Sequence, residues 1–242
     1  MKITRTRLAG LAACAALAGC GGGGGGGQSA FERPTDTFNA RAAWLNLLAA
    51  NRSWSVAGTG SDGRNYNFTL ALSPAVAAVF PPTGVSSPVT NVQATLTLVG
   101  GGSATGLTEV FHDGAGTLLG ERQSGDGVTG TACEKITPGT AQLPPTAVQI
   151  DTADATGALY RSSSLPSCAN TSVDGTATGT WSLEVHAGIT YFCLNAVARD
   201  LSIPAAVVSS ESDCVQVLPD GTLRNAARVR LAVGGFSILA TN

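Results

Sequence analysis

The side chains of this chain that could perform nucleophilic or acid–base chemistry are few and stand far apart. Its only histidines are His112, which precedes Asp-Gly, and His186, which precedes Ala-Gly. A serine hydrolase needs a nucleophile, a base and an orienting group, and the chain contains no Gly-x-Ser-x-Gly elbow to present a serine. The pattern therefore favours solvated turn histidines over a catalytic pair.

Paired carboxyl groups could hydrolyse a glycosidic bond, but such a pair is spatial and the sequence alone does not reveal it. The candidate carboxyl groups are Glu109, Glu121, Glu184 and Glu211. Glu184 falls on the strand face opposite Trp181, where a glutamate is usually solvated. The three tryptophans, Trp44, Trp54 and Trp181, could form a sugar-stacking platform, but their apolar neighbours favour core positions. No catalytic residue is assigned, and an envelope hydrolase stays an alternative.

The first residues of the chain predict export to the cell envelope. Lys2, Arg5 and Arg7 precede an apolar run at 8–19, which is shorter than the about 20 residues that a membrane span requires. The sequence Leu17-Ala18-Gly19-Cys20 that closes the run resembles the lipobox of bacterial lipoproteins. The resemblance implies a signal peptide at 1–19, cleavage before Cys20 and diacylglycerol on the Cys20 thiol, a membrane anchor that would carry palmitate-type acyl chains.

A glycine tether follows the lipidated cysteine. Gly21 to Gly27 are consecutive glycines, and residues 20–30 form a flexible segment with a mean reach of roughly 17 Å. The first residues after Cys20 are glycines and not the aspartate that retains many lipoproteins in the inner membrane. The resemblance therefore implies attachment to the outer membrane, facing the periplasm.

The four cysteines beyond Cys20 predict two disulfide bonds, because their number is even and the compartment is oxidising. Three pairings are possible. We favour Cys133–Cys168 and Cys193–Cys214, since each closes a loop within one run of strands and stabilises the fold by roughly 3–4 kcal/mol. With no Cys-x-x-Cys motif and two histidines, no metal site is predicted, and no cofactor is expected.

The composition and length of the chain limit the classes of partner and the number of domains that can be expected. Only 12% of the residues are charged, lysine occurs only as Lys2 and Lys135, and the part after the signal has no basic cluster. Nucleic-acid binding is therefore not expected. Residues 31–242 are long enough for one large β domain or two small ones. Val110–Leu118 faintly resembles Val215–Leu223, so two related halves remain an alternative to a shared hairpin pattern.

One helix is predicted at about 36–50, with Asp36 as N-cap and alanines and leucines through its length. Phe38, Arg41, Leu45 and Leu48 share one face of this helix. The absence of a basic face favours packing against the domain, or closure of one of its ends, over a position on the membrane surface.

After the helix the hydrophobic period changes to two, which predicts strands with one buried and one wetter face. The clearest cases lie at 65–72, 92–98, 181–186 and 228–233. Such alternation is typical of antiparallel sheets. The sequence therefore predicts an all-β fold, an antiparallel barrel or sandwich of about ten strands preceded by one short helix.

Repeated Asp-Gly pairs predict the turns between these strands. Asp-Gly is a strong hairpin signal because both positions accept positive φ, and none of the pairs has the alternating oxygen ligands of a calcium loop. The pairs are Asp62-Gly63, Asp113-Gly114, Asp126-Gly127, Asp174-Gly175 and Asp220-Gly221.

These observations predict an envelope lipoprotein with a non-catalytic binding or structural role and with an envelope protein or a small apolar ligand as partner. The segment from Thr180 to Asn195, followed by Asp213-Cys214, resembles proteobacterial lipoproteins that carry a polyglycine tether and a disulfide-bearing β domain. That resemblance implies no activity. The alternatives are a carrier that encloses a small apolar ligand in a barrel and the carboxylate-dependent hydrolase.

Overall fold

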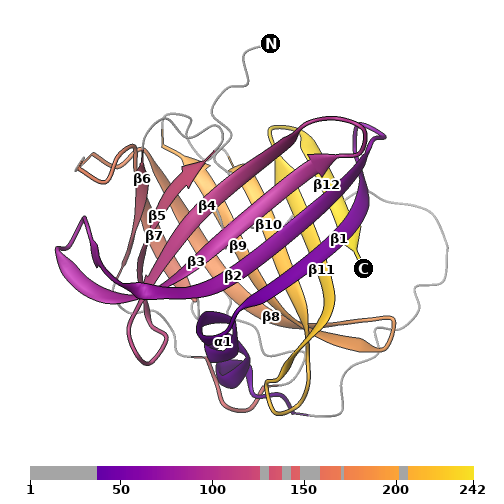
Figure 1. Ribbon diagram of the computed structural model, residues 1–242, viewed down its shortest axis with the longest axis horizontal. Helices are drawn as coiled ribbons and strands as arrows, with labels where there is room; N and C mark the ends of the chain where they lie inside the picture. The colour runs from indigo at the N-terminus through magenta and orange to yellow at the C-terminus, as the bar shows by residue number, and fades with distance from the viewer. Residues whose placement is uncertain (1–36, 126–130, 138–142, 148–158, 170–171, 202–206) are drawn as a thin grey trace.

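The computed structural model describes residues 37–125, 131–137, 143–147, 159–169, 172–201 and 207–242. Within these ranges, twelve antiparallel strands close into a single barrel, and one helix precedes them (Figure 1). The all-β prediction is confirmed, with a barrel in place of a sandwich and two strands more than the predicted ten. The signal segment, Cys20, the tether and the Asp126-Gly127 pair lie outside the described residues.

Each strand pairs with its neighbours in the sequence, and β1 pairs with β12 to close the ring. The helix α1 is Ala40–Ala49. The strands are β1 (Arg52–Gly60), β2 (Asn65–Phe80), β3 (Val85–Leu98), β4 (Ser103–His112), β5 (Leu118–Gly125), β6 (Ala132–Ile136), β7 (Tyr160–Leu165), β8 (Gly175–His186), β9 (Ile189–Asp200), β10 (Val207–Val217), β11 (Leu223–Val233) and β12 (Phe236–Thr241).

The Asp-Gly pairs mark the turns, with one exception. In three hairpin turns the aspartate side chain accepts backbone N–H groups of the same turn, as Asp113 does from Ala115 and Thr117, both at 2.8 Å. The carboxylates of these turns therefore shape the chain locally. Asp174-Gly175 differs, because Gly175 opens β8 and the pair stands at the start of a strand.

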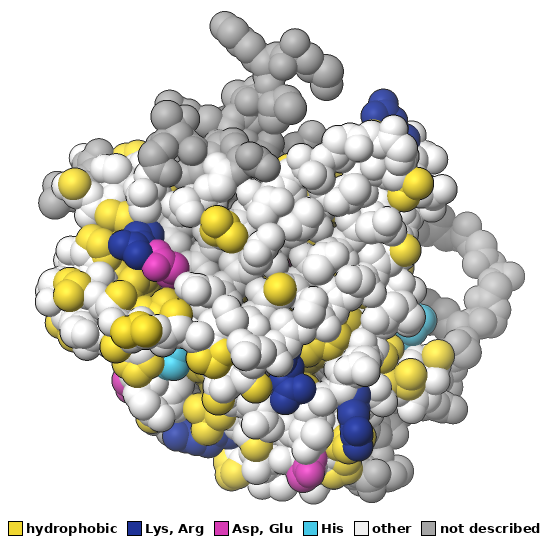
Figure 2. Space-filling model, viewed as in Figure 1, with side chains coloured by type: hydrophobic (Ala, Val, Ile, Leu, Met, Phe, Trp, Pro, Cys, Tyr) yellow, Lys and Arg dark blue, Asp and Glu magenta, His cyan; other side chains and the backbone are white. Residues whose placement is uncertain are grey.

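Period-two alternation assigns the two faces of the barrel wall. Trp54 and Val56 on β1 are buried, while Ser53, Ser55 and Ala57 between them are exposed. The same pattern gives an apolar interior and an outer wall rich in serine and threonine. Figure 2 shows one side of that wall, mostly neutral polar and sparse in charge.

Helix α1 closes one end of the barrel (Figure 1). Its N-cap is Asn39 and not Asp36, and the Asn39 side chain accepts a hydrogen bond from the Ala42 N–H at 2.9 Å. The predicted helical face is partly wrong, since Trp44, Leu47 and Leu48 are buried while Arg41 and Leu45 are half-buried. The apolar face of the helix packs against the barrel core. In the described residues, no helix has the length and apolar character needed to span a membrane.

Both disulfides lie on the outer wall and have the pairing that the sequence analysis favours. Cys193 and Cys214 are direct cross-strand partners on β9 and β10. Cys133 on β6 is bonded to Cys168, which follows β7. This disulfide ties the segment after β7 to the barrel wall.

Candidate functional site

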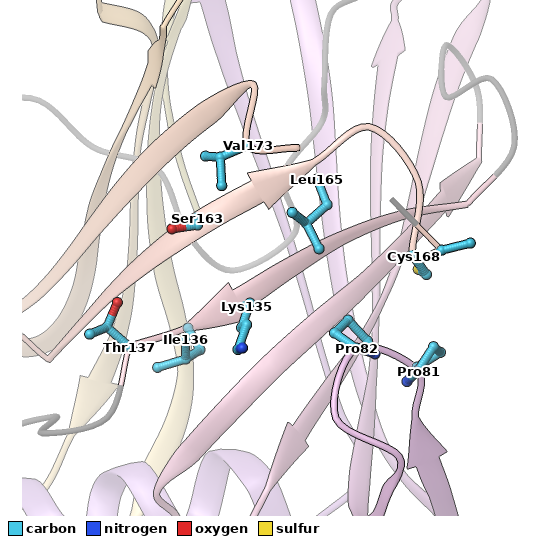
Figure 3. Close-up of a pocket in the computed structure, with 10 residues that line it drawn as sticks. Pro81, Pro82, Lys135, Ile136, Thr137, Ser163, Leu165, Cys168 and Val173 are labelled. Atoms are coloured by element: carbon cyan, nitrogen blue, oxygen red, sulfur yellow. The ribbon is translucent and has the colours of Figure 1, made fainter. Parts of the chain in front are cut away.

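A hollow of about 610 Å³ opens on the outer wall of the barrel beside β6 and β7 (Figure 3). We call it the outer-wall pocket. Its volume falls in the range of about 300–1,000 Å³ that small-molecule sites occupy. The described residues that line it are Pro81, Pro82, Lys135, Ile136, Thr137, Ser163, Leu165, Cys168, Ala169 and Val173.

The β2–β3 hairpin supplies one rim of the outer-wall pocket. These two strands are longer than the others, and a register shift between Ala75 and Ala78 redirects their far ends. Phe80 at the end of β2 is fully buried, with its ring 4.9 Å from that of Phe111. A Cβ at Gly120 would stand 2.1 Å from the Phe80 ring. Glycine on β5 therefore lets the hairpin lie against the wall, which places Pro81 and Pro82 at the pocket.

Strands β6 and β7 form the floor and the opposite rim. Lys135 and Ser163 are cross-strand partners whose side chains lie on the outer face, and Leu165 is buried next to them. In Figure 3, Lys135 and Leu165 extend from neighbouring strands toward Pro82. The Cys133–Cys168 bond holds the segment after β7 in place, and the Cys168 N–H donates to the Thr131 carbonyl at 3.2 Å. A covalent link thus fixes one side of the pocket.

The polar groups of the pocket are available to a ligand. Among the described residues, none forms a hydrogen bond or ion pair with the side chains of Lys135, Thr137 or Ser163. No acidic residue stands among the described lining residues, and Glu134 next to Lys135 points into the barrel. The pocket therefore offers one ammonium and two hydroxyl groups over apolar walls.

A second group of polar residues lies inside the barrel. Glu121 on β5, Glu134 on β6, and Glu211 and Asp213 on β10 are each at most 5% exposed. Glu121 and Glu134 are direct cross-strand partners. Glu134 accepts hydrogen bonds from the Ser162 and Ser164 hydroxyls at 2.7 and 3.3 Å. One oxygen of Glu121 and one of Asp213 have no partner among the described residues.

Burial and mutual repulsion favour the protonated forms of Glu121, Glu211 and Asp213. Burial raises the pKa of Glu121 well above its ordinary value, and the neighbouring Glu134 raises it further. Burial also raises the pKa of Glu211, with added repulsion from Asp213 and Glu121. The pKa of Asp213 rises to about 7 because of burial. No basic side chain of the described chain offsets these shifts, so the group favours protons over negative charge.

The interior next to Asp213 is filled. The cavity there measures about 10 Å³, and its walls include Trp54, Phe68 and Val229. That volume is about enough for one water molecule. Trp44, Trp54 and Trp181 are 5%, 4% and 5% exposed and lie in this core, which confirms the core positions that the sequence analysis favours over a sugar-stacking platform.

The glutamates proposed for hydrolysis do not meet in an open cleft of the described structure. Glu109 pairs with Arg122 on the outer wall, and Glu184 pairs there with Arg230 at 2.9 Å. Glu121 and Glu211 are the interior carboxyl groups described above. Of these four glutamates, two form ion pairs on the outer wall and two belong to the buried interior group.

The histidines have different surroundings. His112 ends β4 half-buried, with Nε2 3.1 Å from the Thr90 hydroxyl and Nδ1 3.0 Å from the Asp113 carbonyl. The Thr90 hydroxyl in turn donates to the Leu48 carbonyl at the end of α1. The prediction of a solvated turn histidine is therefore wrong for His112, which helps to attach the helix. His186 is exposed at the end of β8.

One cluster of three described side chains has the spacing of metal ligands but cannot bind a metal ion through its sulfur atoms. Ligand atoms of Glu184, Cys193 and Cys214 lie within 4.8 Å of one another. The two sulfurs are joined in a disulfide and offer no thiolate to an ion. Among the described residues, no other group of three such side chains converges in this way.

Sequence reasoning missed the outer-wall pocket, because Pro81 and Pro82 reach β6 and β7 only through the folded barrel (Figure 3). The one available signal was Lys135, the single lysine after Lys2, in a chain whose other positive charges are arginines.

Comparison with protein-family models, curated proteins and solved structures finds no match.

Proposed function

We propose that this chain is an envelope-anchored, non-catalytic binding module whose ligand site is the outer-wall pocket. The observation that carries the proposal is a hollow of about 610 Å³ on the barrel wall, whose Lys135, Thr137 and Ser163 side chains pair with none of the described residues. The Cys133–Cys168 bond and the Phe80 contact hold its two rims. A preformed site of this kind binds with little loss of conformational freedom.

The alternatives have less support. A carrier would enclose its ligand in the barrel, but the described cavity next to Asp213 measures about 10 Å³, against the several hundred that a ligand needs. A carboxylate hydrolase needs two carboxyl groups beside a substrate, whereas Glu121 and Glu211 are 1% and 5% exposed.

The anchor belongs to the same proposal. Cys20 would carry the lipid, and residues 20–30 would link it to the barrel as a flexible tether. The binding module would then remain at the outer membrane, facing the periplasm, while the pocket samples the surrounding space.

A blocking substitution tests the site. Ser163→Trp places a large ring in the outer-wall pocket, whereas Gln93→Trp adds the same ring to an exposed outer position on β3. Small molecules would be screened by thermal shift against the fragment from Gln28 onward. We expect Ser163→Trp to abolish the shifts that wild type and Gln93→Trp share. Ligands that stabilise all three proteins equally would contradict the proposed site.

A further inference from the structure

We propose that the outer-wall pocket binds an amphiphile with a single anionic head group, and that Lys135 is the cation that pairs with this head. The inference rests on the proposed function, because it names the ligand class for the same site. It combines three properties of the pocket: one positive charge that pairs with no carboxylate of the described residues, two hydroxyl groups beside it, and apolar walls around them.

The charge argument begins with Lys135. It is exposed, pairs with no described carboxylate, and lies among described lining residues that include no acid. The nearest strand neighbour with a carboxyl group, Glu134, directs that group into the barrel toward Ser162 and Ser164. An anionic group at the pocket would therefore be attracted by Lys135, and none of the described lining residues is an acid that would oppose it.

The two hydroxyl groups extend this interaction. Ser163 is the direct cross-strand partner of Lys135, and Thr137, which directly follows the end of β6, also lines the pocket. Hydroxyl groups can donate to carboxylate or phosphate oxygens, and such bonds are stronger than those between neutral groups. Lys135, Ser163 and Thr137 can thus surround one small anionic head.

The remaining walls fit an apolar tail. Pro81, Pro82, Leu165 and Val173 present hydrocarbon to the hollow, as does the Cys133–Cys168 bridge at its edge. Beyond Pro81 the hairpin carries Val76, Val79 and Val85, which are 89%, 53% and 53% exposed. Figure 2 shows hydrophobic side chains gathered at the left, over this hairpin. A tail longer than the pocket could continue along these valines.

Other ligand classes fit less well. A polyanion would require several cations, and the described lining includes one. A sugar would be expected to stack on an aromatic ring, and none of the described lining residues is aromatic. A cationic amphiphile would be repelled by Lys135.

The experiment uses the mature lipidated protein in phosphatidylcholine nanodiscs. Lys135 is the only lysine after Lys2, so acetylation by an amine-specific reagent reports on it cleanly in peptide mass spectrometry. Dodecanoate, dodecyl phosphate, dodecanol and dodecyltrimethylammonium share one tail and differ in the head. We expect the two anions to slow acetylation of Lys135 at least threefold and the other two to have no effect.

Binding affinities of Lys135 variants complete the test. Lys135→Gln should weaken dodecanoate binding by about fivefold, as expected for a partly solvated charge pair, and Lys135→Arg should restore it. Gln93→Trp serves as the unaffected control. The affinity for monomeric lysophosphatidylglycerol is compared with the affinity for dodecanoate. Tighter binding of the first indicates a phospholipid as the natural ligand, and tighter binding of the second indicates a free fatty acid. Either result supports the proposal.

Two results would overturn the ligand class. Dodecanol that binds as tightly as dodecanoate, with Lys135→Gln unchanged, would show that the head is not recognised. Loss of dodecanol binding in Ser163→Trp would then still support a ligand site at the pocket, so the proposed function would survive. If all four probes bind Ser163→Trp as tightly as they bind the wild type, both the ligand class and the proposed function are overturned.

Discussion

Single residues determine how the barrel responds to pH. Asp213 has a pKa of about 7, and the pKa values of Glu121 and Glu211 are also raised by burial and repulsion. The native state therefore holds these protons more tightly than the unfolded chain does. The aspartates of the hairpin turns have the opposite property, since backbone hydrogen bonds lower the pKa of Asp220 and Asp113.

The first prediction is that the free energy of unfolding falls as pH rises from about 4 to above 7. Asp213 contributes stability that is fully present below its unfolded pKa of 3.8 and is lost as pH rises through about 7. The loss from this residue would be about 4 kcal/mol, since one pKa unit corresponds to about 1.4 kcal/mol. Urea denaturation between pH 4 and 8.5 measures it.

Asp213→Asn is the matched control, because it keeps the size of the side chain and removes the titration. The variant should show a flatter profile over the same pH range. Stability that rises between pH 5 and 8 in the wild type would be inconsistent with protonated interior carboxyl groups.

Two turns of the same design hold the helix in the end of the barrel. The Trp44 indole donates to the Gly116 carbonyl at 2.8 Å, and the Asn46 amide donates to the Gly221 carbonyl at 3.0 Å. Gly116 and Gly221 have φ of +82° and +86° and belong to the β4–β5 and β10–β11 turns. The faint similarity of Val110–Leu118 to Val215–Leu223 thus corresponds to two equivalent turns that contact α1 from different sides.

The second prediction concerns these contacts. Gly221→Ala should lower the free energy of unfolding by more than 1 kcal/mol, because φ is positive and the added Cβ would stand 2.8 Å from the Ala43 backbone nitrogen. Chemical denaturation measures the change. Gly63→Ala is the control, since Gly63 also has positive φ but has open space around it. Equal losses in the two variants would indicate that backbone strain alone matters at Gly221.

Some elements were predictable from sequence for a clear physical reason. Residues 65–72 alternate strictly, and one buried face requires a strand there. The β2–β3 extension was not predictable, because its course depends on a register shift and on the contact of Phe80 with Gly120, which lie far apart in the chain. The outer-wall pocket follows from that contact. The interior group was missed too, since Glu121 and Glu211 meet only across the closed barrel.

The molecule as a whole combines a rigid barrel with the predicted flexible anchor. The described barrel has an apolar core and an outer wall rich in serine and threonine, and the outer-wall pocket lies on that wall. An anchor at Cys20 and a tether with a reach of roughly 17 Å would keep this pocket near the membrane surface. A ligand that itself resides at that surface would then meet the site at high local concentration.

The third prediction addresses the anchor. Cys20→Ser should leave the precursor uncleaved by the lipoprotein peptidase and unlabelled by a palmitate analogue, because lipid attachment requires the thiol. Metabolic labelling followed by immunoprecipitation measures this. Cys14→Ser, within the same signal segment, should be labelled like the wild type, and normal labelling of Cys20→Ser would disprove the anchor.

The pairing of β1 with β12 has a consequence for how the chain acquires its structure. Gly58 is opposite Ala240, so the closing contact joins the two ends of the described chain, whereas every other strand pair joins strands that are consecutive in sequence. Local hairpins form quickly and distant pairings slowly, because loop-closure entropy opposes the latter. During the proposed export with the N-terminus first, β1 would emerge long before its partner and expose an unpaired edge. We therefore expect nascent chains to depend on periplasmic chaperones until β12 arrives, and aggregation to begin at this edge when export is stalled.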